Sequence, residues 1–70
     1  MIGIFRTNIN TVKDKDDVID AISASFSVNA CSVDIEDCDK VLRVISPQQL
    51  AERTIIEFVN RLGFRCDILD

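Results

Sequence analysis

Apolar and polar residues alternate with a period of two in four stretches of the chain, and longer stretches of helical periodicity separate them. The alternating stretches are residues 2–9, 30–36, 40–46 and 64–70. Alternation over four to eight residues is typical of strands with one buried face. We therefore predict four strands, with Phe5, Leu42 and Val44 among the side chains that face the core.

Residues 11–26 repeat apolar side chains at helical spacing, with Val18 and Ile22 on one side and acidic residues on the other. This pattern predicts an amphipathic helix. Thr11 is followed three residues later by Asp14. A hydroxyl and a carboxylate at this spacing form a capping box, which satisfies the first free amides of a helix.

Residues 47–62 predict the second helix. Ser46 and Pro47 are typical of a cap residue and of the first helical position, respectively. Gly63 stands where a left-handed C-terminal cap is expected. The helix is therefore expected to run from Pro47 to Leu62.

The order strand, helix, strand, strand, helix, strand is that of an α+β, ferredoxin-like fold. With strands numbered along the chain, we expect a four-stranded antiparallel sheet of order 4-1-3-2. Right-handed crossovers would place both helices on one face of this sheet. Residues 1–70 contain no linker or break in composition, so we predict a single domain.

The sheet face away from the helices carries an apolar set in this prediction, mixed with charged residues of both signs. The set is Ile2, Ile4, Val41, Ile45 and Leu69. Apolar residues in this number are typical of a docking or dimer surface, although scattered exposed aliphatic residues are equally ordinary. The pattern leaves both interpretations open.

The charge balance disfavours several classes of partner. Twelve acidic and eight basic residues give a net charge of −4, and only 6% of the residues are aromatic. Nucleic-acid binding needs a basic stripe or stacking rings, and an anionic membrane surface also attracts basic residues. No apolar run approaches the roughly 20 residues that cross a bilayer, and residues 1–8 lack the pattern of a signal peptide. We therefore expect a cytoplasmic protein that binds neither nucleic acid nor membrane.

The residues available for catalysis are few. Histidine is absent, and Cys31, Cys38 and Cys66 match neither a disulfide framework nor a paired zinc-ligand spacing. Cys31 and Cys66 fall on inward faces, where burial raises the pKa of a thiol. The chain is thus expected not to be an enzyme and to hold no cofactor.

An acidic cluster marks the start of the first predicted helix. Asp16, Asp17 and Asp20 are weak candidates for binding a hard cation, because carboxylates suit such ions. Val18 and Ile19 interrupt the alternate ligand spacing of a calcium loop. A solvated cluster that complements the helix dipole is the preferred interpretation.

In residues 5–14, Ile9 lies two positions before Thr11, and Asp14 lies three positions after Thr11. Near the other end of the chain, Leu62-Gly63-Phe64 leads into the last predicted strand. This arrangement resembles the heavy-metal-associated domains, the family of small copper chaperones and of metal-binding modules in metal-pumping ATPases. The resemblance covers nearly all of the chain. Thr11 and Asp14 occupy the positions of the family's Cys-x-x-Cys motif, and a hydroxyl with a carboxylate is a poor site for a soft ion.

The resemblance implies a non-enzymatic domain whose soft-metal site is degenerate and which acts through contact with a protein partner or a second copy. The alternative is residual binding or transport of a metal ion, by the carboxylates named above or through Cys38 of two copies. A paired small-ligand sensor ranks last, because the chain lacks a glycine-rich turn after the first strand.

Overall fold

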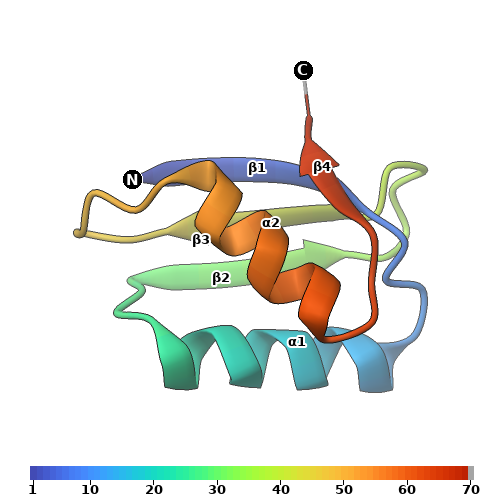
Figure 1. The fold of residues 1–70 in the computed structure, drawn as a ribbon. Helices are drawn as coiled ribbons and strands as arrows, with labels where there is room; N and C mark the ends of the chain where they lie inside the picture. The colour runs from blue at the N-terminus through green and yellow to red at the C-terminus, as the bar shows by residue number, and fades with distance from the viewer. Residues whose placement is uncertain (70) are drawn as a thin grey trace.

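The computed structural model describes residues 1–69, in which four strands alternate with two helices (Figure 1). The elements are β1 (Ile2–Thr7), α1 (Val12–Ser25), β2 (Ala30–Asp34), β3 (Val41–Ile45), α2 (Glu52–Arg61) and β4 (Cys66–Ile68). The prediction of a small α+β chain is confirmed, and the arrangement is compatible with a ferredoxin-like fold. Of the strand predicted over residues 64–70, Asp70 lies outside the described residues. Neither helix within residues 1–69 has the length and apolar character that crossing a membrane requires.

All strand pairs are antiparallel, and the strand order across the sheet is β2-β3-β1-β4. Counted from the β4 edge, the same sheet reads 4-1-3-2. Phe5 pairs with Leu42 on one side and with Ile68 on the other, so β1 and β3 are central. Figure 1 shows α2 lying across the front of the sheet and α1 running alongside β2.

The core forms on one face of the sheet, because burial follows the period of two. In β1, Gly3, Phe5 and Thr7 are buried while the residues between them are exposed. A buried cluster joins this face to both helices; its members are Phe5, Ile9, Val18, Ile22, Val33, Leu42, Val44, Ile55, Val59 and Cys66. The inward positions predicted for Phe5, Leu42 and Val44 are confirmed.

The start of α1 is capped as the sequence predicts. The Thr11 hydroxyl accepts a hydrogen bond from the backbone N–H of Asp14 at 3.1 Å. At the other end of α1, Phe26 packs edge-on against Phe58 of α2, with ring centroids 5.1 Å apart. This edge-to-face contact joins the two helices and is a favoured geometry for aromatic pairs.

The predicted start of α2 at Pro47 is wrong. The helix begins at Glu52, and its N-cap residue Ala51 makes no side-chain capping bond. Ser46 instead continues the sheet, since its N–H donates to the Met1 carbonyl at 2.9 Å, and its hydroxyl donates to the Ser27 carbonyl at 2.5 Å. The Ser46 hydroxyl also accepts from the Gln48 N–H at 3.1 Å, so Ser46 begins a turn after β3 and not α2 itself.

The end of α2 agrees with the prediction for Gly63. Its φ of 102° lies in the region that favours glycine. The N–H of Gly63 donates to the Asn60 carbonyl and the N–H of Phe64 to the Val59 carbonyl. This pair of bonds is the Schellman motif, which satisfies carbonyls at a helix end.

Candidate functional site

The sheet face opposite the buried core cluster, here called the outer face, carries a row of exposed isoleucines. Ile2 is 73% exposed, and Ile4 and Ile45 are each 40% exposed. Ile2 pairs with Ile45 across β1 and β3, so these two side chains adjoin. Leu69 is half-buried, and its N–H donates to the Ile4 carbonyl at 3.1 Å, which places it next to Ile4. Four of the five predicted apolar residues thus gather at one end of the outer face.

The prediction that Val41 belongs to this exposed set is wrong, because Val41 is only 3% exposed. Val41 nevertheless alternates in β3 with the same parity as Arg43 and Ile45, which places it on the outer face. It is not a member of the core cluster. Val41 pairs with Asp34 in the neighbouring strand. We attribute its burial to longer polar side chains around it, which cover a small side chain on an otherwise wet face.

The other end of the outer face is charged. Asp34 on β2, Arg6 on β1 and Asp67 on β4 are exposed there and share the outward parity of their strands. Arg43 on β3 is also exposed and outward, but it pairs with Ile4 and therefore lies beside the isoleucine row. Arg6 and Asp67 are direct cross-strand partners. The outer face therefore has an apolar end, which Arg43 borders, and an end with charges of both signs.

The loop that resembles a metal site has a structural role in this chain. The Thr11 hydroxyl is used as the helix cap, and Asp14 contributes its backbone N–H to that bond. Asp16, Asp17 and Asp20 are exposed, and Asp17 pairs with Lys13 at 2.9 Å. The structure does not bring the α1 carboxylates together as a set of metal ligands; across residues 1–69, that description fits only Asp37, Cys38 and Asp39.

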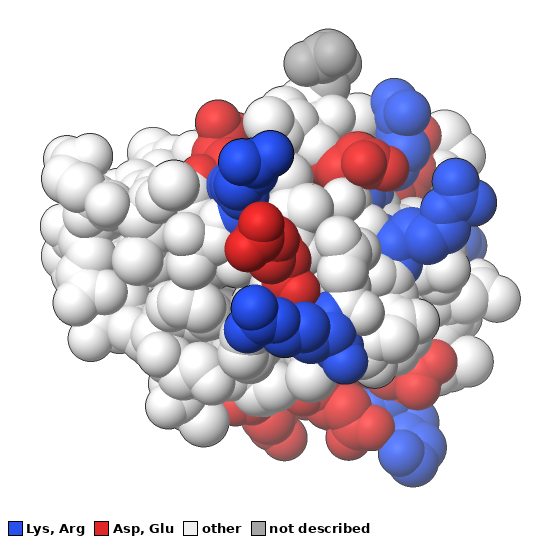
Figure 2. Space-filling model, viewed as in Figure 1, with Lys and Arg blue, Asp and Glu red and all other residues white. Residues whose placement is uncertain are grey.

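On the face viewed in Figure 1, charged side chains form separate groups on a largely uncharged surface (Figure 2). Acidic side chains gather along the lower edge, over α1, and a basic, acidic and basic stripe crosses α2. Within this stripe Arg53 and Glu57 form an exposed ion pair of 3.9 Å. Such pairs contribute little to stability. The groups of charged side chains on this face contrast with the isoleucine row of the outer face.

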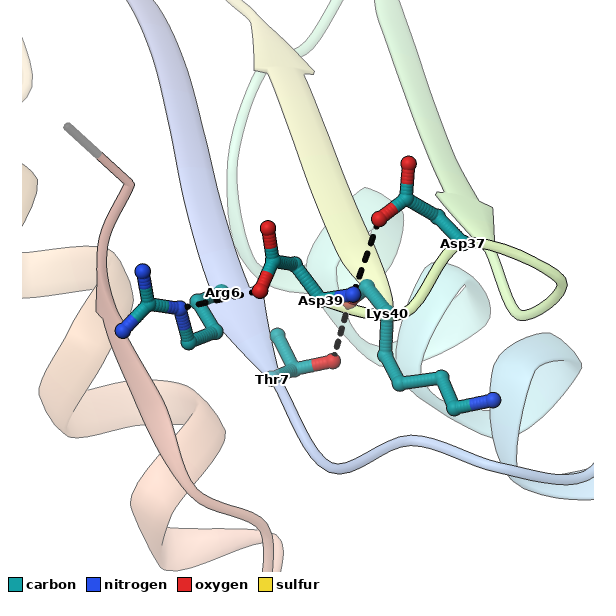
Figure 3. A network of polar contacts seen from close by, with 5 residues as sticks. All are labelled: Arg6, Thr7, Asp37, Asp39 and Lys40. Atoms are coloured by element: carbon teal, nitrogen blue, oxygen red, sulfur yellow. Dashed lines mark hydrogen bonds and ion pairs between the residues drawn. The ribbon is translucent and has the colours of Figure 1, made fainter.

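A polar network ties the turn between β2 and β3 to the end of β1 (Figure 3). The Thr7 hydroxyl donates to the Lys40 carbonyl at 2.6 Å, and the Thr7 N–H donates to the Asp39 carbonyl at 3.1 Å. Arg6 Nε lies 3.3 Å from Asp39 Oδ1, and Asp37 Oδ1 accepts from the Asp39 N–H at 2.8 Å. Lys40 has a φ of 47°, a left-handed conformation that these contacts hold in place.

This turn brings together Asp37, Cys38 and Asp39, whose ligand atoms lie within 4.8 Å of one another. Cys38 is exposed. The sequence predicts Cys38 in a turn between Asp37 and Asp39, but these three residues were not predicted to form one set of metal ligands. The sequence signal for this turn is the spacing of Asp34, Asp37 and Asp39. Aspartate side chains stabilise tight turns by accepting hydrogen bonds from the backbone N–H groups that follow them.

Cys31 and Cys66 lie on the opposite edge strands β2 and β4, as predicted. Burial raises the pKa of the Cys31 thiol to about 11. Burial, with a smaller contribution from the negative charge of Asp67, raises the pKa of the Cys66 thiol to about 12. Both thiols are therefore protonated at neutral pH and are poor nucleophiles and metal ligands.

A shallow depression of about 230 Å³ lies where β1 ends beside β4; it is lined by Arg6, Thr7, Asn8, Arg65 and Asp67. Sequence reasoning missed it, because its residues come from the two ends of the chain. The register of the outermost strand pair, which joins Arg6 to Asp67, brings them together.

Comparison with known proteins gives this chain no relatives: no protein-family model matches it, and no curated protein matches it.

Proposed function

We propose that this chain is a non-enzymatic, cytoplasmic domain that acts through protein–protein contact at the outer face. The observation that carries the proposal is the isoleucine row, Ile2, Ile4 and Ile45, exposed beside the half-buried Leu69. Contiguous apolar surface of this kind is typical of interaction sites, because water is released when a partner covers it.

The partner that fits the outer face is a second copy of the chain. In an isologous contact one patch meets itself, so the patch must be self-complementary. The isoleucine row can pack against its own copy, and the outer face also carries two arginines, Arg6 and Arg43, and two aspartates, Asp34 and Asp67. Opposite charges on one face allow a two-fold arrangement in which arginines of one copy meet aspartates of the other.

Sedimentation over a concentration series tests the proposal. The chain is expected to dimerise with rising concentration, and Ile2→Thr with Ile45→Thr is expected to shift the equilibrium to monomer. Threonine keeps the β-branched shape that suits a strand while removing apolar surface. Val12→Thr is the matched control, since Val12 is 61% exposed but belongs to α1. A monomer at every concentration, or equal effects of both changes, would contradict the proposal.

We further propose a ferredoxin-like fold with both helices on one sheet face, in a domain similar to the heavy-metal-associated family whose thiolate site has been replaced. The helical residues Val18, Ile22, Ile55 and Val59 share one cluster with the inward strand residues, which supports this arrangement. The Thr11 cap supports a loop that orders itself without a metal ion. Removing that cap is therefore expected to loosen the start of α1, as argued below.

Residual metal binding is the second candidate, and the Asp37, Cys38 and Asp39 cluster favours it. Titration with Zn²⁺ and Cu(I), followed through the amide signals of residues 9–17 and 37–39, separates the two functions. Shifts confined to residues 37–39 that disappear in Cys38→Ser would establish a site at this turn. Unchanged signals at stoichiometric metal would exclude it.

A further inference from the structure

The depression between the ends of β1 and β4 gathers two arginines, although the chain as a whole carries a net charge of −4. Arg6 and Arg65 line it together with Asn8, Thr7 and Asp67. Arg6, Arg65 and Asp67 are all exposed, so the depression is open to solvent. Its volume of about 230 Å³ is below the usual range of pockets for drug-sized ligands, and all of its lining residues are polar or charged, which favours a small polar group.

Several hydrogen-bond donors around this depression have no acceptor within the described residues 1–69. Arg6 engages Asp39 through Nε, and Figure 3 shows its two terminal nitrogens directed away from Asp39. Across residues 1–69, Arg65 has no acidic side chain within ion-pair distance. Asn8 Oδ1 accepts from the Arg65 N–H at 2.8 Å, which leaves the Asn8 side-chain amide as a donor.

We propose that this depression binds a carboxylate group, supplied by an acidic side chain or by the C-terminus of a peptide. Two guanidinium groups and an amide offer planar, paired N–H donors, the geometry that carboxylate oxygens accept in bidentate fashion. Asp39 already pairs with Arg6, and Asp67, the single carboxylate that lines the depression, also opposes an anion. Its presence predicts weak, reversible binding that responds in opposite directions to loss of an arginine and loss of Asp67.

The site lies outside the isoleucine row but shares Arg6 and Asp67 with the charged end of the outer face, so it is tested at a concentration at which the chain is a monomer. The probes are N-acetylglycine, which mimics a peptide C-terminus, and N-acetyl-aspartic acid α-amide, which mimics an acidic side chain. N-acetylglycinamide is the neutral control. At constant ionic strength, the amide and arginine Nε–H signals of Arg6, Arg65 and Asn8 are expected to shift saturably, with a Kd on the order of millimolar. The tighter of the two acids identifies the source of the carboxylate.

Variants assign the binding to these side chains. Arg65→Gln is expected to weaken binding roughly threefold to tenfold, the range for one charge-assisted contact. Asp67→Asn is expected to strengthen it roughly threefold by removing a like charge. Because the second effect is a gain, unfolding cannot produce it. Arg43→Gln, on the same face but outside the depression, is the matched control and is expected to leave the Kd unchanged.

Three results would overturn the proposal. The first is a linear, unsaturated response to both acids. The second is an equal response to N-acetylglycinamide, which would show that charge is not recognised. The third is an equal loss of affinity in Arg43→Gln and Arg65→Gln, because general surface charge would then explain the binding.

Discussion

Gly3 lies on the core side of β1, against the ring of Phe5. A Cβ atom at this position would stand 2.6 Å from Phe5 Cε2 and 2.8 Å from the terminal methyl of Met1. Phe5 is fully buried at the centre of the core cluster, so its ring has little freedom to move away. The glycine is therefore required by close packing rather than by its backbone conformation.

Gly3→Ala is expected to destabilise the chain by about 1–3 kcal/mol, the range for an added methyl group in a packed core. Urea unfolding followed by circular dichroism measures the change. Ser32→Ala, on the exposed side of β2, is the control and is expected to alter stability by less than about 0.5 kcal/mol. If Gly3→Ala had the unfolding free energy of the wild type, the ring of Phe5 could repack at no cost, and close packing would not require the glycine.

The buried thiol of Cys66 predicts a pH dependence of stability. Its pKa is raised from 9.0 to about 12, so the folded chain holds this proton at pH values where the unfolded chain releases it. The stabilising contribution is complete below pH 9 and is lost as the pH rises from 9 towards 12. Between pH 8 and pH 10, the unfolding free energy of the wild type should therefore fall more than that of Cys66→Val. Cys38→Ser, which changes an exposed thiol, is expected to retain the wild-type fall.

At the scale of the element, the caps explain which helix ends were predictable. Thr11 and Gly63 act locally, through bonds to residues three and four positions away, and both predictions are confirmed. Ser46 accepts a local bond from the Gln48 N–H, as a cap residue would, but it also bonds to Ser27 and Met1, which are distant in sequence. Long-range sheet pairing therefore displaced the start of α2, and a local pattern contains no signal for it.

Thr11→Ala is expected to cost about 1 kcal/mol of stability, because the Asp14 N–H loses its acceptor at the start of α1. Hydrogen exchange of the first-turn amides should rise in the same variant. Thr11→Ser keeps the hydroxyl and should restore most of the loss. Thr54→Ala removes an exposed threonine within α2 and is the control for general helix effects. Equal stability of Thr11→Ala and wild type would contradict a capping role.

For the whole molecule, the alternation of the strands predicted which sheet face is buried and most of the apolar residues on the other face. Val41 was the exception, because a period of two assigns a side chain to a face without saying what covers it. The depression at Arg6 and Arg65 was not predicted, since it depends on the pairing of the first strand with the last. Contacts between residues from the two ends of the chain follow from the strand topology and register, which a local sequence pattern does not contain.

Self-association through the outer face is the central claim for the whole molecule. The most direct measurement records amide chemical shifts from dilute to concentrated solution and maps the changes on the sheet. Self-association through the outer face predicts saturable changes in the amide shifts of Ile2, Ile4, Ile45 and Leu69, while the exposed side of α2 is unaffected. The double variant Ile2→Thr with Ile45→Thr is expected to lose these changes. Spectra independent of concentration, or changes centred on α1 and α2, would contradict this self-association.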